Sequence, residues 1–370
     1  MNILAYKSRG FMNVSYRAYS HTCPCTSPIA ATRTLLTKKT DFITPRKNAD
    51  VTFDTFSGAE HPPYPLSRRE AFSFVENVLG LEHPDTLFKT DPIQNLTKIA
   101  ERMKKVSPFT TMQFFDGSPF QINDEYCKGH MLHGHGGGCI FINPFTKALL
   151  EQLGYKTNDV PARVVASTDA FHISTLVCDL CYPGSLHLIE PGTVRPIFHP
   201  ISLHFEQEST VYEVFGLRNK FFKRSDGNLV WCMEPFPKML ERLGDDEVIQ
   251  DSAGKKWQIF LIYSLQEKKM GRYHFNKYWH KLIRGQGYIP PRTHGFVHNA
   301  YKDGDLINFF ANKEKKFVQI MHEDSTEEVR ELKKEELLTF FEDKFPGFPT
   351  RMLARAVREN FHISHVSPKS

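Results

Sequence analysis

The chain has 370 residues, enough for two or three structural units with a sizeable buried core. Its seven cysteines are too few and too unevenly spaced for a secreted disulfide scaffold. No uncharged apolar stretch approaches the roughly 18 residues of a membrane span. We therefore expect a soluble, intracellular protein. The formal net charge is +5, and residues 1–50, with eight Lys/Arg and two Asp, contribute +6 (8 − 2) of it. The rest of the chain therefore has a net charge of about −1 (5 − 6), which gives no indication of nucleic-acid binding.

The N-terminus has the composition of a targeting segment. Residues 1–40 contain no Asp or Glu and six Lys/Arg, with many Ser and Thr. An Arg-rich, Ser-rich and acid-poor start is typical of a mitochondrial transit peptide, and Arg17–Ser20 resembles the cleavage context of such leaders. The alternative is a disordered basic tail over residues 1–50. We expect the mitochondrial matrix if a leader is cleaved, and the cytoplasm otherwise.

Helical spacing of apolar residues begins after a Pro-containing linker at Gly58–Pro65. Leu96, Ile99 and Met103 recur at i, i+3 and i+7, the spacing of one helix face. The pattern predicts a mostly helical domain over residues 55–155. Its predicted helices are Arg69–Leu79, Pro92–Val106 and Pro144–Leu153.

A glycine-rich segment ends this domain, with four glycines in residues 134–138 directly before Cys139. Glycines let the backbone approach closely and leave the sulfur accessible, and a helix beginning nearby would stabilise a thiolate. The pattern indicates a nucleophilic cysteine, with a buried, unreactive cysteine in a turn as the alternative. Pro144 predicts that the next helix begins there, with Asn143 as its cap.

Short β-rich runs separated by turn signals dominate the middle of the chain, which predicts an antiparallel, barrel-like domain over residues 156–270. An α/β unit over residues 271–370 follows. The predicted strands of the middle domain are Arg163–Ser167, Phe171–Cys178, Leu186–Glu190, Ser209–Phe215, Phe221–Lys223, Leu229–Cys232 and Trp257–Ser264, with a helical insertion at Phe236–Leu243. Those of the last unit are Phe296–Ala300, Asp305–Ala311 and Lys316–His322, followed by helices at Thr326–Phe341 and Thr350–Asn360.

Two of these strands flank the turn residues Pro183-Gly184 and form a predicted hairpin centred near Cys181–Tyr182. That centre places His172 and Glu190 roughly opposite each other, close enough to pair. A carboxylate on one imidazole nitrogen leaves the other nitrogen free to take a thiol proton. Cys139, His172 and Glu190 are therefore a candidate nucleophile, base and orienting acid.

Taken in this order, the residues resemble the arylamine N-acetyltransferase family. Its nucleophile motif, Arg-Gly-Gly-x-Cys-aromatic-Glu-x-Asn, is similar to residues 135–143 (HGGGCIFIN). Its Leu-Gly-aromatic and Ala-Arg-Val steps are matched by residues 153–155 and 162–164, and its Leu-Val-Asp-x-Gly segment by residues 188–192. The resemblance runs from about residue 65 to 355 and depends on order and spacing.

The resemblance implies an α+β fold with a helical N-terminal domain, an antiparallel β-barrel-like middle domain and an α/β C-terminal lid. It implies an acyltransferase in which Cys139 takes an acetyl or other short acyl group from acetyl-CoA and passes it to an arylamine, hydrazine or similar amine. His172 would be the base, Glu190 the acid, and Thr168 a contact near the CoA phosphates. We expect a monomer that needs no metal.

The chain also departs from the family motif. The motif arginine is His135 and the motif glutamate is Phe141, so an ion pair of the family is missing. The triad acid is Glu190 in place of aspartate, and a one-residue slip of the hairpin would make Asp179 the competing acid. Two alternatives stay open: a transglutaminase-like cysteine amidase or protease, and a catalytically degenerate homologue with a binding role.

Two further patterns resemble metal or redox sites. Cys178-x-x-Cys181 is half of a zinc or redox motif, with Cys23-x-Cys25 as its only partner pair. His130, His133 and His135 form a short histidine tract. Because the second cysteine pair lies in the predicted leader and the histidines lead into the nucleophile loop, we expect no metal at either place.

Overall fold

The computed structural model describes residues 64–115, 123–165, 170–266, 296–311, 316–345 and 347–361. The chain divides into two units, residues 1–54 and 55–370, and every described residue lies in the second. The predicted leader and nearly all of the predicted linker therefore lie outside the described residues. No helix in the described part is both long and apolar enough to cross a membrane.

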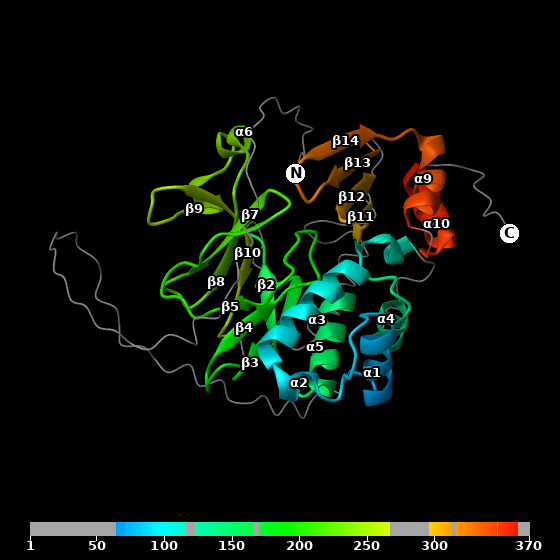
Figure 1. Cartoon of the computed structure of the whole chain (residues 1–370). Helices are drawn as coiled ribbons and strands as arrows, with labels where there is room; N and C mark the ends of the chain where they lie inside the picture. Colours follow the sequence, from blue (N-terminus) through cyan, green and yellow to red (C-terminus); the bar gives the residue numbers. More distant parts are fainter. Residues whose placement is uncertain are drawn as a thin grey trace. The chain divides into compact units, whose positions relative to one another are not determined.

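The second unit begins with helices, as the apolar spacing predicts (Figure 1). Ser67 and Glu70 form a capping box at the first of them, because the Ser67 hydroxyl accepts from the Glu70 N–H while the Glu70 carboxylate accepts from the Ser67 N–H. Asp91 caps the third, whose first residue is Pro92. The helices are α1 (Arg68–Asn77), α2 (Leu87–Thr90), α3 (Pro92–Val106), α4 (Asp124–Leu132) and α5 (Cys139–Gln152).

Helix α5 is the most buried of these, with Phe141, Phe145 and Leu149 fully enclosed. It packs against α4 and against the strands β2 (Lys156–Arg163) and β3 (His172–Cys178). The sequence pattern did not predict α4, although Asn123 caps it and two acidic residues open its first turn.

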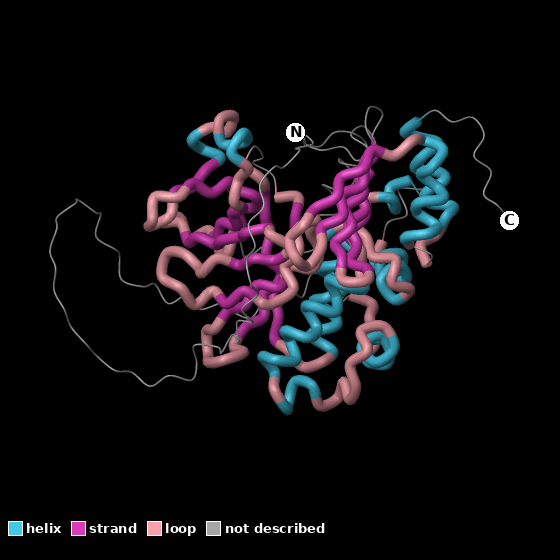
Figure 2. Tube along the Cα trace, turned by 45° about the horizontal axis from the view of Figure 1, so that its top comes forward, coloured by secondary structure: helices cyan, strands magenta, loops and turns pink. Residues whose placement is uncertain are grey.

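An antiparallel sheet of nine strands follows and curls like half of a barrel (Figure 2). Its order is β5-β4-β3-β2-β10-β8-β7-β6, with β9 paired to β10. Leu176, Trp231 and Tyr263 belong to a core on one face, whereas Ile173 and Val177 pack from the other face of β3 into the core around α5. The strands are β2 (Lys156–Arg163), β3 (His172–Cys178), β4 (Leu186–Ile189), β5 (Ile201–Ser202), β6 (Tyr212–Val214), β7 (Leu217–Lys223), β8 (Leu229–Met233), β9 (Val248–Gln250) and β10 (Lys256–Tyr263), with α6 (Pro237–Leu240) after β8.

Strands β3 and β4 form the predicted hairpin in a different register. Thr175 pairs with Ile189, so the register continues with Glu190 opposite Ser174 and not opposite His172. The hairpin is centred at Tyr182, within the predicted centre, and Asp179 enters the turn with a positive φ of 57°. Because His172 and Ser174 are two residues apart on one strand, Glu190 still shares a face with both.

The predicted strand Arg163–Ser167 is misplaced. The structure has β2 at Lys156–Arg163, paired with β3 from Lys156 to Ala162 and with β10 at its end. This segment contains Asn158, Asp159 and Pro161, residues that strands usually avoid. Neighbouring strands on both sides override that local preference, which the sequence pattern alone cannot reveal.

A second antiparallel sheet has the order β1-β11-β12-β13-β14. Its edge strand β1 comes directly after α3, so this sheet is joined to the helical region. On one face His298 and Phe309 pack against Phe341, with ring centroids 4.9 and 5.0 Å apart. The elements are β1 (Phe109–Thr110), β11 (Phe296–Lys302), β12 (Asp305–Ala311), β13 (Lys316–Met321), β14 (Glu327–Glu331), α9 (Leu337–Lys344) and α10 (Thr350–Phe361).

The predicted helix Thr326–Phe341 is wrong over its first half, which forms β14. This segment is rich in Glu and Arg, which favour helices, but its backbone pairs with β13 from Met321↔Glu327 to Phe317↔Glu331. All its side chains are exposed, as on a charged edge strand that resists pairing with another chain. The helix α9 begins only at Leu337.

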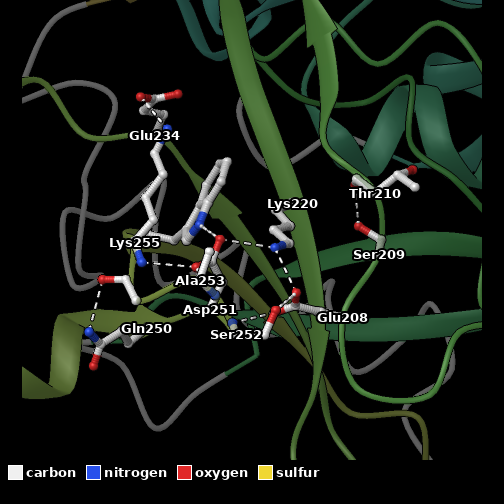
Figure 3. Close-up of polar contacts among 12 residues, drawn as sticks. Glu208, Ser209, Thr210, Lys220, Glu234, Gln250, Asp251, Ser252, Ala253 and Lys255 are labelled. Atoms are coloured by element: carbon white, nitrogen blue, oxygen red, sulfur yellow. Dashed lines mark hydrogen bonds and ion pairs between the residues drawn. The ribbon is translucent and has the colours of Figure 1, made fainter. Parts of the chain in front are cut away.

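An ion-pair cluster surrounds Lys220 of strand β7 in the nine-stranded sheet (Figure 3). The Lys220 ammonium lies 3.0 Å from the carboxylates of both Glu208 and Asp251, and the Trp257 indole donates to Asp251 over 2.9 Å. Burial lowers the pKa of Lys220, but the two carboxylates outweigh it and raise this pKa overall. The cluster shows how this protein compensates a buried lysine with direct acidic partners.

Candidate active site

The glycine-rich segment lies against the strand that follows α3. The Gly137 N–H donates to the Pro108 carbonyl over 3.1 Å, and the Thr110 N–H donates to the Gly137 carbonyl over 3.0 Å. Gly136 has a φ of 64°, and a Cβ there would lie 2.0 Å from the Pro108 oxygen. Only glycine therefore allows the loop to approach Pro108 this closely.

Cys139 is the first residue of α5, with Gly138 as the N-cap. The prediction that the helix begins at Pro144 with Asn143 as its cap is wrong, because Pro144 lies inside the helix. A proline there removes the hydrogen bond to the Ile140 carbonyl and crowds that carbonyl, and the buried apolar face of α5 offsets this cost. Asn143 uses its side chain for contacts to other segments.

The Cys139 side chain is nearly enclosed, at 7% exposure, and its Sγ lies 3.9 Å from the Phe171 carbonyl. At the N-terminus of α5 it faces the positive end of the helix dipole and backbone N–H groups without partners inside the helix. Among the cysteines of the described ranges, Cys181 is half-buried and the others are buried.

His172 begins β3 and is 5% exposed. Its Nε2 lies 2.9 Å from Glu190 Oε2 and 3.0 Å from Ser174 Oγ. Burial lowers the pKa of His172, but the charges of Glu190 and Cys139 and hydrogen bonds to both raise it to about 10. The imidazole therefore lies between the carboxylate and the sulfur, and favours the protonated form.

Glu190 is 2% exposed and lies at the centre of a polar network. Its Oε1 accepts from Asn143 Nδ2 over 3.0 Å, and its Oε2 accepts from the Tyr263 hydroxyl over 3.0 Å and from the Ser174 hydroxyl. Burial raises the pKa of Glu190, but the charge of His172 and the hydrogen bonds from His172, Ser174 and Asn143 outweigh it and lower this pKa overall.

The structure thus brings Cys139, His172 and Glu190 together and adds three polar residues that the sequence pattern did not identify. Ser174 is two residues from His172 on the same face, a spacing that could have identified it. Asn143 was assigned to a cap. Tyr263 comes from β10, and no local signal in the sequence connects it with the site.

Among the remaining predicted site residues, Thr168 is outside the described residues, and the others lie elsewhere. Asp179, the competing acid, forms an ion pair with Lys156 at the other end of β3, with 2.5 Å between Nζ and Oδ2. Cys181 Sγ lies 3.6 Å from His187 Nε2, and Cys23 and Cys25 are outside the described residues.

The histidine tract forms a ring cluster beside the glycine-rich segment. The ring centroid of His135 lies 5.6 Å from that of His130 and 5.7 Å from that of His133, and the His130 ring lies 5.8 Å from Phe141. Within the described ranges no three His, Cys, Asp or Glu side chains are grouped to hold a metal ion. His135 and Phe141, which stand where the family motif has arginine and glutamate, thus both pack their rings against His130.

No protein-family model matches the sequence, and no curated protein matches it. Solved structures do match. An arylamine N-acetyltransferase from Nocardia farcinica aligns with a TM-score of 0.59 at 15% identity, over 80% of this chain and 97% of that chain. One from Mycobacterium abscessus gives 0.60 at 11% identity, over 81% and 99%. One from Mycobacterium marinum, in complex with CoA, gives 0.58 at 16% identity, over 78% and 100%. At these identities the likeness concerns the fold, and the chain has the fold of the arylamine N-acetyltransferases.

Proposed function

We propose that this protein is a cysteine-dependent acyltransferase that moves an acetyl or other short acyl group from acyl-CoA to an arylamine, hydrazine or similar amine. The observation that carries the proposal is the buried arrangement of Cys139 at a helix N-terminus beside an imidazole that Glu190 holds. Its agreement with the fold of the arylamine N-acetyltransferases supports this choice among cysteine chemistries.

Before the first half-reaction the thiol proton of Cys139 passes to the imidazole, which gives a thiolate–imidazolium pair of Cys139 with His172. Its Nε2 already faces Glu190, so Nδ1 is the nitrogen left for this transfer. The Cys139 thiolate attacks the thioester carbonyl of acyl-CoA, a new carbon–sulfur bond forms, and the bond to the CoA sulfur breaks. CoA leaves with the proton from His172, and an acyl-cysteine remains.

In the second half-reaction the amine attacks the acyl-cysteine and His172 takes its proton. The carbon–sulfur bond breaks, the amide is released, and Cys139 returns to its starting state. In this proposal the first backbone N–H groups of α5, at Cys139 and Ile140, stabilise the oxyanion in both steps, an effect worth roughly a few kcal/mol. This sequence gives ping-pong kinetics.

The acyl donor follows from the same comparison. The structure from Mycobacterium marinum contains CoA, which supports an acyl-CoA donor here. Thr168 remains our predicted contact near the CoA phosphates. Its substitution by Val is expected to raise the half-saturating concentration of acetyl-CoA without changing alkylation of Cys139.

The test of the proposal is the turnover of Cys139→Ala with acetyl-CoA and an arylamine. Loss of the nucleophile from a cooperating triad typically costs on the order of 10⁴ to 10⁶ in turnover. Cys181→Ala is the matched control, because Cys181 is the more exposed cysteine and should leave turnover unchanged. Retention of more than about a tenth of the activity in Cys139→Ala would reject the proposal.

Two measurements separate the alternative functions. A transglutaminase-like amidase would release ammonia from glutamine peptides, and a chain that does so without using acyl-CoA would be of that class. A degenerate homologue would leave Cys139 inert. Rapid, stoichiometric alkylation of Cys139 by iodoacetamide near neutral pH argues against it, with peptide mapping to distinguish Cys139 from Cys181.

A further inference from the structure

Helix α3 buries one charged side chain next to the site. Lys104 is 3% exposed, and its Nζ donates to the Pro191 carbonyl over 3.3 Å and to the Thr193 carbonyl. These two carbonyls belong to the segment that directly follows Glu190. A residue nearly ninety positions earlier in the chain therefore anchors the backbone that carries the proposed acid.

Lys104 differs from the other buried lysine in its partners. Lys220 lies against two carboxylates. Among the described residues, the Lys104 ammonium donates to these two carbonyls, and Glu190 acts on it through charge. Burial lowers the pKa of Lys104 to about 7, against the opposing effect of Glu190. Since an apolar side chain would fill this space without the desolvation penalty, packing alone does not account for a lysine here.

The same turn is held from its other side by α5. The Gly192 N–H donates to Asn143 Oδ1 over 3.0 Å, and Asn143 Nδ2 donates to Glu190 Oε1. A Cβ at Gly192 would lie 2.6 Å from the Asn143 amide, so the two segments are in close contact. Lys104 donates to carbonyls of the turn, and Asn143 accepts from an N–H of the same turn. Together these contacts leave the backbone that follows Glu190 little freedom.

We propose that Lys104 is a positioning residue for the triad acid, holding the Pro191–Thr193 turn through its ammonium and supporting the Glu190 carboxylate by its charge. This inference depends on the proposed function. In the reactive state the charges alternate and sum to zero: Lys104 positive, Glu190 negative, His172 positive and Cys139 negative. Without Lys104 the same buried set carries a net negative charge, which favours protonation of Glu190.

The charged groups near Lys104 determine how its loss should change the dependence of the rate on pH. Glu190, from the end of β4, is the titratable group whose charge acts on Lys104. On α3 itself, Lys105 pairs with Glu101 at 2.6 Å and lies over the Tyr301 ring. Loss of the Lys104 charge should therefore raise the pKa of Glu190 and move the acidic limb of the rate profile to higher pH.

The test uses the full chain and measures single-turnover acylation of Cys139 by acetyl-CoA across pH, together with melting curves. Lys104→Met is expected to lower the maximal acylation rate by about 10- to 100-fold, by analogy with residues that orient catalytic ligands, with the half-saturating acetyl-CoA concentration little changed. Lys104→Arg should keep the wild-type acidic limb. Lys104→Gln, which keeps a donor and removes the charge, should shift it.

Two controls separate positioning from stability. Lys220→Met removes the other buried lysine and should lower the melting temperature without moving the acidic limb. Lys98→Met, exposed on the same helix, should change neither. An acidic limb in Lys104→Gln that coincides with the wild type would overturn the inference, and this holds even if Lys104→Met does not fold.

The outcome for Lys104 can be distinguished from the outcome for the proposed function. Alkylation of Cys139 by iodoacetamide depends on the same imidazole and carboxylate and needs no acyl-CoA. A wild-type chain that is alkylated and not acylated would reject the proposed function. The shift of the alkylation profile in Lys104→Gln would still support the positioning role, and its absence would reject it.

Discussion

At the scale of single residues, the feature that governs the site is a carboxylate with no access to water. Glu190 accepts from Asn143, Ser174 and Tyr263 and faces the His172 imidazole, so the network compensates its charge. A buried carboxylate with this many donors stays ionised and has one available orientation. The proposed role of Glu190 in orienting His172 depends on both properties.

Replacement of this acid is the most direct residue-level prediction. Glu190→Gln is expected to reduce acyl transfer by about 10² to 10⁴, by analogy with loss of the acid in other triads, because a neutral amide neither fixes the imidazole nor stabilises its protonated form. Turnover of acetyl-CoA with an arylamine is the measurement, with a melting curve to show that the variant folds.

Asp179→Asn is the matched control for that variant. Asp179 pairs with Lys156 beyond the far end of β3, so its loss removes an exposed ion pair and should leave turnover near wild type. The reverse result, an inactive Asp179→Asn and a nearly active Glu190→Gln, would mean that the wrong acid has been assigned.

The residues differ in how far the sequence could identify them. Cys139, His172 and Glu190 were proposed from motif order and hairpin spacing, which are local properties. Tyr263 is 73 residues from Glu190 and reaches it only because β10 pairs with β2. Lys104 reaches the turn after Glu190 because α3 lies beside it. Contacts set by packing between distant segments have no signature in a single sequence.

At the scale of elements, the glycine-rich segment and α5 act as one unit. The loop is pinned to Pro108 and Thr110, and the helix begins within two residues of that contact. The position of the Cys139 sulfur is thus set by backbone hydrogen bonds and by the absence of side chains at residues 136–138, which are all glycine. Local sequence rules suggested a later helix start because Pro144 disfavours a helical residue before it.

Two glycines of this loop test that account. Gly136→Ala is expected to destabilise the protein by more than about 3 kcal/mol and to abolish acyl transfer, because its Cβ would overlap the Pro108 oxygen. The matched variant Gly134→Ala also has a positive φ, 70°, but its Cβ would meet nothing closer than 3.8 Å. It should cost only about 1 to 2 kcal/mol and remain active.

Chemical unfolding and turnover of both variants provide the measurement. Equal stability losses for Gly136→Ala and Gly134→Ala would show that conformation alone, and not the close approach to Pro108, makes glycine necessary in this loop.

Elements with a strong periodic pattern were predicted well, and elements defined by pairing were not. Helix α3 has its predicted bounds, since an apolar face and a cap at Asp91 act together. The charged residues of strand β14 predict a helix, whereas pairing with β13 decides its structure. Strand β2 was misplaced for the same reason, with partners on both sides.

At the scale of the whole molecule, the sequence indicated a helical region, an antiparallel sheet and a final α/β region in this order along the chain. The described elements follow that order. The short strand β1 follows the helical region in sequence but pairs with β11 in the sheet of the last region. This pairing was not predictable, because a strand of two residues is too short to show an alternating apolar pattern. We propose the domain boundaries that the sequence predicts, at residues 55–155, 156–270 and 271–370.

The N-terminal segment gives a prediction at the same scale. Because residues 1–40 lack acidic residues and residues 55–370 form a separate unit, a chain that starts near residue 50 is expected to fold and keep full activity. Its melting curve and turnover should match those of the full chain. If the segment is a cleaved leader, the native N-terminus should begin near Ser20 or later, and recovery of intact Met1 from cells would contradict cleavage.

The central claim is that Cys139 carries an acyl group during turnover. The most direct measurement is intact-mass spectrometry of the full chain after incubation with acetyl-, propionyl- or malonyl-CoA without amine, followed by peptide mapping. We expect one acyl group on Cys139, none on Cys181, no adduct in Cys139→Ala, and loss of the group when an arylamine is added. A wild-type chain that stays unmodified with every donor, or that carries the group at another residue, would contradict the account.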